Sequence, residues 1–511
     1  MTNRQGSIPK YIEGYGKVAC YGEVVPKRTM AHKRSVTEIQ SKDKISTLKE
    51  AICQSNLQDG MTVSFHHHLR NGDYVMKRVL DTIHELGIKD LTVSASSISK
   101  IHDSLLEYLQ DGTITRIYTA GLRSQLAHEV QHHFNLKAPI VFMTHGGRAR
   151  AIEDGSLNID IAFVAASCSD YYGNMCGTRG PSAFGSMGYP MVDVAYAKRS
   201  IAITDNLIED MTEAYPDEIS ISGDYVDYVV EVERIGDPEQ IATGSTRITS
   251  NPMDLLIARK TAHALIASGA IRQGFSFQAG SGGISLAVCK FLESYMKQNQ
   301  IVGAFASGGV TGNLVELFEK GLFEKLYDVQ TFGQDAIDSL RDHAGHVEMS
   351  ADTYANPNNP KCIVNQLDVM ILSATEIDVD FNINSITGSN GVIMGALGGA
   401  PDTAAGAKMA VVVAPSMRTR IPIVVDKVTT ICTPGTDIDM LVTERGICVN
   451  PKREDIKRSL IDAGIEVISI HELKDNIQKL TGVPDKPTLG DKIVAVVEYR
   501  DGSVIDVIYN L

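Results

Sequence analysis

The sequence predicts an α/β protein made of two tandem, related units with largely parallel sheets. Short β-branched runs alternate with helical patterns from residue 46 onward, which is typical of strands and helices that follow one another in a parallel sheet. The alternation starts again near residue 252. A chain of 511 residues is also too long for one compact core, because single domains usually hold about 100–200 residues.

The first unit is expected to begin with a helix and then to alternate strictly. Its apolar periodicity predicts a helix over 46–56, a strand over 61–65, a polar loop over 66–73, a helix over 74–86 and a strand over 91–94. Further strands are predicted over 140–144, 161–165 and 192–195.

The second unit repeats this order. A long helix is predicted over 252–267, and strands over 275–278, 303–305, 369–373 and 411–413. Both units contain a glycine, then a strand, then a small or polar loop, starting at Gly60 and at Gly274. The turn-rich passage 233–244 marks a boundary between them. We therefore divide the chain into an N-terminal arm (1–45), a first unit (46–240) and a second unit (241–511).

Composition excludes several classes of function. No stretch approaches the ~18 uncharged apolar residues of a membrane span, and the N-terminus has no apolar signal core, so we expect a cytoplasmic protein. The net charge of -14 argues against nucleic acid and requires local cations at any site for an anion. The eight cysteines are scattered, which predicts reduced thiols and neither a disulfide framework nor a zinc site.

Four glycine-rich segments are candidates for ligand binding. They span 280–283, 307–312, 388–391 and 395–399. Glycine lets backbone amides approach a ligand closely, and a helix that follows offers free N–H groups to an anion. The alternative is that they are only tight turns. None has the form of a Walker motif or a dinucleotide fingerprint.

Histidines and arginines supply candidate anion ligands. His66 and His68 could share one face of an extended segment, where a substrate-facing role and a purely structural role are both open. Suitably spaced carboxylates or cysteines are missing near them, so we expect no metal. Arg148 follows a predicted strand, where open α/β sheets place ligands, and could clamp a carboxylate; Arg179 is a weaker candidate.

Several further segments carry a family resemblance. They are 59–63, 89–93 and 169–174 in the first unit, and 374–380, Asn384, 395–399 with Asp402 and Gly406, 428–430 and 442–446 in the second. Together they resemble the coenzyme A transferase family, and within it the α subunits of citrate lyases. The resemblance covers the chain from about residue 46 and implies two coenzyme A transferase-like (NagB/RpiA-like) domains.

One departure from the family pattern bears on mechanism. Covalent coenzyme A transferases carry a nucleophilic glutamate in the second domain. Registration on the helix that follows places Gly308 at that position, and an alternative register places Ser389 there. Neither residue is a carboxylate. The resemblance therefore implies direct exchange without a covalent enzyme intermediate, and the space left by the missing side chain at Gly308 is expected to admit a substrate carboxylate.

The resemblance implies transfer of an acyl-carrier thioester from acetyl to citrate, giving citryl-carrier and acetate. It implies a lyase (β) and an acyl-carrier (γ) subunit as partners in an oligomer. It also implies no directly bound cofactor beyond the carrier's phosphoribosyl-dephospho-coenzyme A arm, for which acetyl-coenzyme A is a surrogate. The expected catalytic residues are Gly308, Gly309, Gly398, Gly399, Ser389 and Asn390, and the expected substrate-binding residues are His66, His68, Arg148, Arg179, Gly280, Ser281, Gly282, Ser307 and Thr311.

Three alternatives stay open at this point. One is a covalent acyl-coenzyme A:carboxylate transferase that uses another carboxylate, such as Glu376. Another is a sugar-phosphate sensor, although the first 45 residues supply no basic DNA-binding helices. The third is a scaffold that only docks the other subunits.

Overall fold

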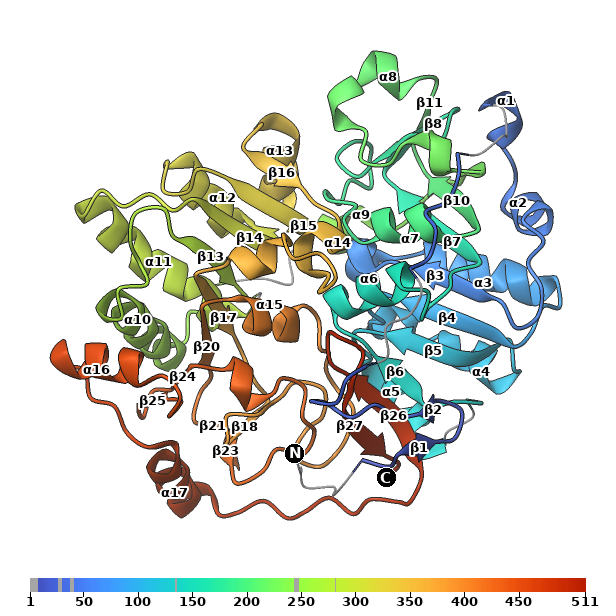
Figure 1. Ribbon diagram of the computed structural model, residues 1–511. Coiled ribbons are helices and arrows are strands. Elements are labelled where there is room, and N and C mark those ends of the chain that lie inside the picture. Colours follow the sequence, from blue (N-terminus) through green and yellow to red (C-terminus); the bar gives the residue numbers. More distant parts are fainter. Residues whose placement is uncertain (1–7, 26–29, 37–40, 134–135, 243–247, 281) are drawn as a thin grey trace.

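The computed structural model describes residues 8–25, 30–36, 41–133, 136–242, 248–280 and 282–511. Two large sheets stand beside each other, with helices packed against both (Figure 1). Most neighbouring strands in both sheets are parallel, so the predicted fold class is confirmed. The described residues contain no helix that is both long and apolar enough to cross a membrane.

The first sheet has nine strands in the order β12-β10-β7-β3-β4-β5-β6-β26-β27. The strands are β3 (Thr62–Phe65), β4 (Leu91–Ala95), β5 (Ile114–Thr119), β6 (Ile140–Phe142), β7 (Ile161–Ala166), β10 (Arg199–Thr204), β12 (Tyr228–Glu231), β26 (Ile493–Glu498) and β27 (Val504–Tyr509). The helices of this half are α1 (Ser41–Lys44), α2 (Leu48–Gln54), α3 (Val75–Glu85), α4 (Leu105–Gln110), α5 (Ser124–His133), α6 (His145–Glu153), α7 (Pro190–Tyr196), α8 (Met211–Ala214) and α9 (Pro238–Ala242).

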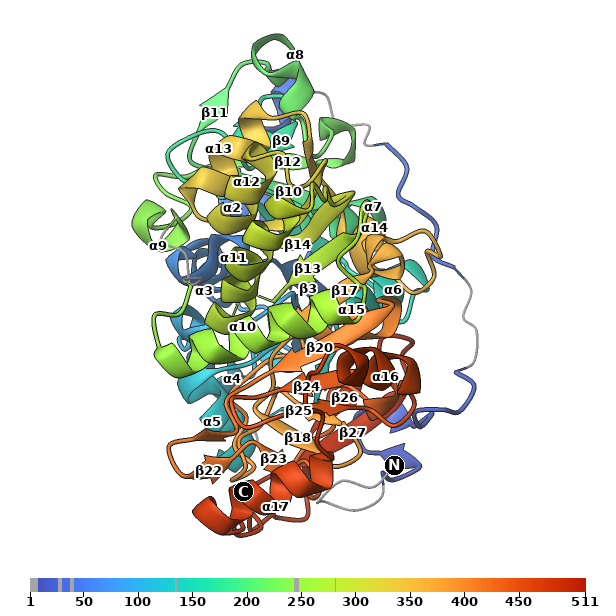
Figure 2. The same cartoon turned by 90° about the vertical axis from the view of Figure 1, so that its left-hand side faces the viewer.

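The second sheet has eight strands in the order β16-β15-β14-β13-β17-β20-β24-β25. The strands are β13 (Ser276–Ala279), β14 (Phe305–Thr311), β15 (Leu326–Phe332), β16 (His346–Glu348), β17 (Val369–Leu372), β20 (Met409–Val413), β24 (Met440–Val442) and β25 (Ile447–Val449). The helices are α10 (Pro252–Ala267), α11 (Gly283–Gln298), α12 (Gly312–Glu319), α13 (Gln334–Asp342), α14 (Ala351–Ala355), α15 (Ala400–Gly406), α16 (Glu454–Asp462) and α17 (Ile470–Thr481). Figure 2 shows α10 and α11 in front of this sheet, on its side away from the first half.

Short strands complete the fold. They are β1 (Tyr11–Ile12), β2 (Gly16–Lys17), β8 (Cys168–Asp170), β9 (Met175–Cys176), β11 (Leu207–Ile208), β18 (Glu376–Asp378), β19 (Ile383–Asn384), β21 (Met417–Arg418), β22 (Ile421–Pro422) and β23 (Val424–Val425).

One predicted strand is a helix. Residues 192–195 lie in α7, where Pro190 occupies the first turn and favours helical φ. Val192, Asp193 and Val194 are all buried there, and a fully buried short run has no periodicity that separates strand from helix. The neighbouring strand is β10, a few residues later. The predicted strand over 303–305 is also displaced, because β14 starts at Phe305 and runs through the glycine-rich segment.

The C-terminus departs from the division at residue 240. Strands β26 and β27 form a hairpin that extends the first sheet, with β26 parallel to β6, although sequence order assigned them to the second unit. Apolar residues of the N-terminal arm, Ile12 and Val18, pack on this hairpin against Val504. Both ends of the described chain therefore meet at one edge of the first sheet.

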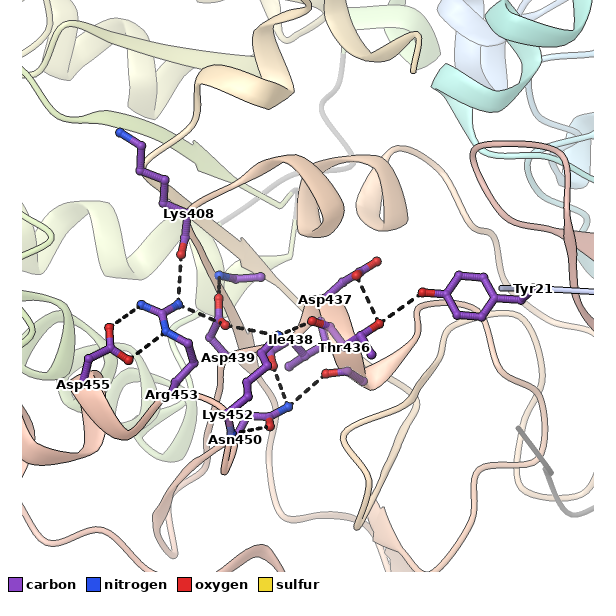
Figure 3. Close-up of polar contacts among 12 residues, drawn as sticks. Tyr21, Lys408, Thr436, Asp437, Ile438, Asp439, Asn450, Lys452, Arg453 and Asp455 are labelled. Atoms are coloured by element: carbon purple, nitrogen blue, oxygen red, sulfur yellow. Dashed lines mark hydrogen bonds and ion pairs between the residues drawn. The ribbon is translucent and has the colours of Figure 1, made fainter. Parts of the chain in front are cut away.

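The arm also touches the second half. The Tyr21 hydroxyl lies 3.1 Å from Thr436 Oγ1, next to a polar network at the edge of the second sheet (Figure 3). In this network Asp439 pairs with Arg453 at 3.0 Å and with Lys452 at 3.4 Å, and Arg453 also binds Asp455. All eight cysteines are free of disulfide bonds.

Candidate functional site

A cavity of about 740 Å³ lies between the two halves. Its walls come from the segments that follow β3, β4, β5 and β6 in the first sheet and β13 and β17 in the second, together with residues at the end of β15. These are carboxyl ends of parallel strands, where α/β sheets bind ligands. The cavity is therefore the site that the fold favours.

Three helices begin at the wall of this cavity. Gly282 is the N-cap of α11, Gly399 is the N-cap of α15, and His145 is the first residue of α6; all three line the cavity. A helix N-terminus presents free N–H groups and the positive end of the helix dipole. Three of them around one space make a strongly anion-attracting environment.

The charged side chains of the wall have the same sign. Arg70, Lys100 and Arg123 line the cavity, and none of its described lining residues is an aspartate or a glutamate. In a chain of net charge -14, this is the local concentration of cations that an anionic ligand requires. A second hollow of about 740 Å³ between α12 and α13 is lined by five carboxylates and is electrostatically the opposite.

Arg70 is held rigidly in an uncommon backbone conformation. Its φ is 55° and its ψ is -129°, a region that costs free energy for a residue with a side chain. The guanidinium lies 4.4 Å from the centre of the Phe332 ring and donates to the Ile241 carbonyl at 3.0 Å. Burial lowers the pKa of Arg70 to about 10, which leaves it charged at neutral pH. Sequence reasoning missed this residue, although it lies in the polar loop after the first strand.

Two neutral histidines lie next to each other in the cavity wall. The rings of His67 and His145 stack at 5.4 Å, and both contact the Tyr189 ring, at 4.8 and 4.7 Å. Burial, reinforced by the neighbouring His145, lowers the pKa of His67 well below its usual value, and burial with Arg148 lowers that of His145 to about 3. Both rings are therefore uncharged hydrogen-bonding groups at neutral pH.

The glycine pair at 398–399 presents open backbone amides. Gly398 has a φ of +56°, and neither its N–H nor that of Gly399 has an acceptor among the described residues. Both residues line the cavity. A Cβ on Gly399 would stand 2.6 Å from the hydroxyl of Tyr354, so only glycine fits there. These two expected oxyanion donors are therefore at the cavity with their N–H groups open.

The glycine pair at 308–309 has a different environment. These residues lie inside β14, whose register against β15 shifts between them. Gly309 lines the cavity and Gly308 does not. A Cβ on Gly308 would stand 2.4 Å from Nε2 of Gln278, whose side chain is held by Ser307 and by the Tyr354 hydroxyl. The expected empty space beside Gly308 is thus filled by Gln278, and that expectation is wrong.

Arg148 and His66 are occupied by the protein itself. Arg148 donates to both carboxylate oxygens of Asp193 at 2.6 Å, and His66 Nε2 lies 3.1 Å from the same carboxylate. Burial would raise the pKa of Asp193, but Arg148 and His66 hold it well below its usual range. All three side chains are buried and none lines the cavity. Their predicted role as substrate ligands is not supported, because a buried charge first requires its own counter-ion.

His68 and Arg179 lie away from the cavity. The ring of His68 stacks on Phe184 at 4.1 Å, and its Nε2 lies 3.1 Å from the Ala165 carbonyl, inside the first half. Arg179 binds Glu218 at 2.6 Å and lines a separate, smaller hollow. The histidine that reaches the cavity is the middle one of the run, because the chain turns into a 3₁₀ helix at His67–Gly72 and leaves the strand alternation.

The remaining predicted residues divide between the cavity and other places. Gly280 and Gly282 line the cavity, and Ser281 lies outside the described residues. Ser307 is buried behind it, and Thr311 faces the acidic hollow. Ser389 and Asn390 do not line the cavity; they belong to a turn in which Gly391 N–H donates to the Gly388 carbonyl.

The alternative nucleophile, Glu376, is also occupied. Its carboxylate accepts hydrogen bonds from the Thr429 amide at 2.8 Å and from Asn384 Nδ2 at 2.9 Å, and the side chain is buried outside the cavity wall. The cavity residues that sequence reasoning missed include Lys100, Arg123, His145, Tyr189, Gln278 and Tyr354. The sequence could have indicated some of them only by their position, because several directly follow strands of the first sheet.

Comparisons with known proteins agree with this architecture. The family model for the citrate lyase alpha subunit (CitF) matches residues 41–511. The citrate lyase alpha chain of Haemophilus influenzae is 45% identical over 513 residues, covering 100% of both chains, and that of Klebsiella pneumoniae is 44% identical over 509 residues, covering 99% of this chain and 97% of the relative.

A solved structure agrees equally well. It is described as the alpha subunit of citrate lyase from Streptococcus mutans in complex with citrate, with a TM-score of 0.93, 45% identity, and coverage of 99% of this chain and 98% of that one. From the match over residues 41–511 and the identity over full length, the chain belongs to the citrate lyase alpha subunit family.

Proposed function

We propose that this chain catalyses the exchange of acyl thioesters between acetate and citrate. Acetyl-carrier and citrate enter, and citryl-carrier and acetate leave. The observation that carries this is the cavity wall, which combines three cations and three helix N-termini with no carboxylate among its described lining residues. Citrate has three carboxylates and requires such a wall. The citrate in the Streptococcus mutans relative supports the choice of substrate.

The exchange takes place in two steps of acyl transfer. A citrate carboxylate oxygen attacks the acetyl carbonyl carbon, the C–S bond breaks, and the carrier leaves as a thiolate beside a mixed acetyl–citryl anhydride. The thiolate then attacks the citryl carbonyl carbon and acetate leaves with the electron pair of the C–O bond. Each addition creates an oxyanion, and a preorganised N–H donor there is typically worth about 3 kcal/mol.

The open amides of Gly398 and Gly399 are the donors that fit this role. They require no rearrangement when the negative charge develops, because the backbone that carries them is fixed: the Gly398 carbonyl accepts from the His145 amide at 3.0 Å, and Leu397 donates to Ala120 at 2.8 Å. Both bonds join the two halves of the molecule. The oxyanion site is therefore built from the interface between the halves.

The cations have different positions and different tasks. Arg70 is buried and rigid, which suits a fixed clamp on a citrate carboxylate. Lys100 and Arg123 are exposed, and neither has an ion-pair partner among the described residues. Exposed unpaired cations at the cavity suit the phosphates of the carrier's prosthetic arm, for which acetyl-coenzyme A is the surrogate. The carrier (γ) and lyase (β) subunits are the proposed partners.

The wall also favours direct exchange over a covalent mechanism. A covalent transferase needs a carboxylate nucleophile, and the described lining residues offer none, while Glu376 is buried in hydrogen bonds of its own. In direct exchange the attacking carboxylate belongs to citrate. The enzyme supplies only position and charge stabilisation.

The proposal is tested with acetyl-coenzyme A and citrate in the absence of the other subunits. We expect citryl-coenzyme A, detected by mass spectrometry, from the wild type, and a rate at least 10-fold lower at limiting citrate from Arg70→Gln. The matched control is Arg116→Gln, an arginine outside the cavity that pairs with Asp90 at 3.3 Å. Absence of citryl thioester from the wild type would exclude a transferase and favour a docking scaffold.

A further inference from the structure

His145 stands where the two halves meet and is held from several sides. Its backbone N–H donates to the Gly398 carbonyl at 3.0 Å, which ties the start of α6 to the glycine pair. Its ring packs against two other rings, with centres 5.4 Å away at His67 and 4.7 Å away at Tyr189. The side chain lines the cavity. The ring is thus positioned by contacts within the first half, while its backbone is tied to the second half.

The two ring nitrogens of His145 have different environments. Nδ1 is buried and has no hydrogen-bond partner among the described residues. A buried N–H without an acceptor costs the free energy of its desolvation, about 1–3 kcal/mol. The positive charge of Arg148 disfavours a second proton on the ring, so the ring carries a single one. These effects place the single proton of the neutral ring on Nε2.

Nε2 faces the glycine pair. A Cβ built on Gly398 would point toward it and stand 3.8 Å away, and that direction lies in the cavity that both residues line. An acceptor atom in this space can receive a hydrogen bond from His145 and from the open amides of the pair. His145 and the two open amides therefore border the same part of the cavity, where a developing oxyanion needs donors.

We propose that His145 is a catalytic residue that donates its Nε2–H to the oxyanion held by the amides of Gly398 and Gly399. This inference rests on the proposed acyl exchange and adds a side-chain donor to it. No proton is transferred: the hydrogen stays on Nε2, and the bond strengthens as charge develops on the substrate oxygen. This role explains why Nδ1 has no hydrogen-bond partner among the described residues. An acceptor beside Nδ1 would stabilise the proton there and remove it from Nε2, where the reaction uses it.

The neutral state of the ring is consistent with this role. Burial and the charge of Arg148 keep the pKa of His145 near 3, so the ring remains a neutral donor at physiological pH. The two rings that contact it also keep their charge state at physiological pH, while the nearby Asp402, which accepts from Gly146 N–H, has a pKa raised to about 6. His67 has its pKa lowered well below the usual value by burial, and Tyr189 has its pKa raised by burial.

The first test compares two substitutions at this position. Gln retains an N–H donor near the place of Nε2, and Leu has none. We expect His145→Leu to lower kcat about 100-fold with the KM for citrate changed less than 3-fold, and His145→Gln to recover at least 10-fold of that loss. The matched control is His128→Leu on the exposed face of α5, which should leave kcat unchanged.

The second test is the tautomer of the wild-type ring, measured by ¹⁵N NMR with labelled histidine. We expect Nδ1 to have the shift of a bare nitrogen and Nε2 that of an N–H, with this tautomer retained between pH 5 and 8. A proton on Nδ1, or equal losses in the Gln and Leu variants accompanied by a raised KM, would overturn the proposal. If the wild type performs no citrate exchange, the proposed function itself fails, and the tautomer measurement still reports on the ring.

Discussion

The two glycine pairs of the second half, 308–309 and 398–399, look alike in sequence and differ in what occupies the space beside them. At Gly308 the protein's own Gln278 side chain fills the place of a Cβ at 2.4 Å. At Gly398 and Gly399 the amides are open to the cavity. A glycine marks the close approach of another group, and the structure decides whether that group is a side chain or a ligand.

The largest effect on catalysis should come from adding a methyl group at the pair 398–399, whose amides are open to the cavity. Gly398→Ala keeps the backbone N–H, but its new Cβ enters the space in front of His145 and blocks the substrate oxygen from the donors. We therefore expect kcat to fall about 100- to 1,000-fold, as it does when an oxyanion donor is removed. Gly321→Ala is the matched control, because Gly321 also has a positive φ (+72°) but has nothing within 4 Å of its Cβ position. If both variants have the same activity, the open pair is not the oxyanion site.

The helix behind the open pair predicts a pH effect on stability. Burial raises the pKa of Asp402 from 3.8 to about 6, against the charge of Arg500 and hydrogen bonds from Gly146 N–H and Thr144 Oγ1. Between these pH values the folded state retains a proton that the unfolded state has lost. Stability therefore falls by roughly 2–3 kcal/mol as pH rises from 4 to 6 and stays lower above it.

Asp402→Asn should remove this contribution, so that the variant loses less stability than the wild type between pH 4.5 and 7. Urea unfolding of both proteins at pH 4.5 and 7 measures how much free energy of unfolding each one loses over this range. The other carboxylates titrate in both proteins, so their contribution cancels when the two losses are subtracted. Parallel pH dependence in the two proteins would mean that Asp402 titrates normally.

A substitution at the pair 308–309, where Gln278 fills the neighbouring space, should change the free energy of unfolding more than the catalytic rate. Gly308→Ala drives a methyl into the Gln278 amide and strains a residue at φ +100°, so we expect a loss of about 1–3 kcal/mol in the free energy of unfolding. Gln278→Ala should restore part of that loss in the double variant, since it empties the contested space. Strictly additive losses in the double-mutant cycle would contradict the steric account.

The smallest effect distinguishes the two arginines by their partners. Arg70→Lys retains the charge but loses the planar fork, so the KM for citrate should rise about 10-fold with an unchanged melting temperature. Arg148→Lys should instead lower the melting temperature, because it disturbs the bidentate pair with buried Asp193. Steady-state kinetics and calorimetry on both variants separate the roles, and exchanged phenotypes would show that Arg148 binds substrate.

Much of the fold follows from the sequence because periodicity is local. The helix at Pro252–Ala267 agrees with its prediction at both ends, where Asn251 caps and Pro252 opens the first turn. The strand predicted over 192–195 failed because three successive residues, Val192, Asp193 and Val194, are all buried, which hides the period. The C-terminal hairpin failed because pairing between β26 and β6 joins segments some 350 residues apart along the chain, and no local pattern encodes it.

The sequence predicted the parts of the site that are made by backbone amides of glycine loops. It did not predict which charged side chains are available, because that depends on their ion-pair partners in the fold. Glycine loops after strands marked Gly280, Gly282, Gly398 and Gly399. The cations were misassigned because Arg148 meets Asp193 across the fold, and that partner decides its role. An arginine with no internal counter-ion is the one available to a ligand, and the sequence alone does not reveal which arginine that is.

The central claim is that the enzyme contributes no nucleophile, and trapping tests it most directly. Wild-type protein is incubated with acetyl-coenzyme A, with and without citrate, treated with borohydride or quenched in acid, and weighed by intact mass spectrometry. The account predicts an unmodified chain in every sample while citryl-coenzyme A accumulates. A stoichiometric acyl or thioester adduct on a carboxylate, or its reduced alcohol after borohydride, would contradict direct exchange.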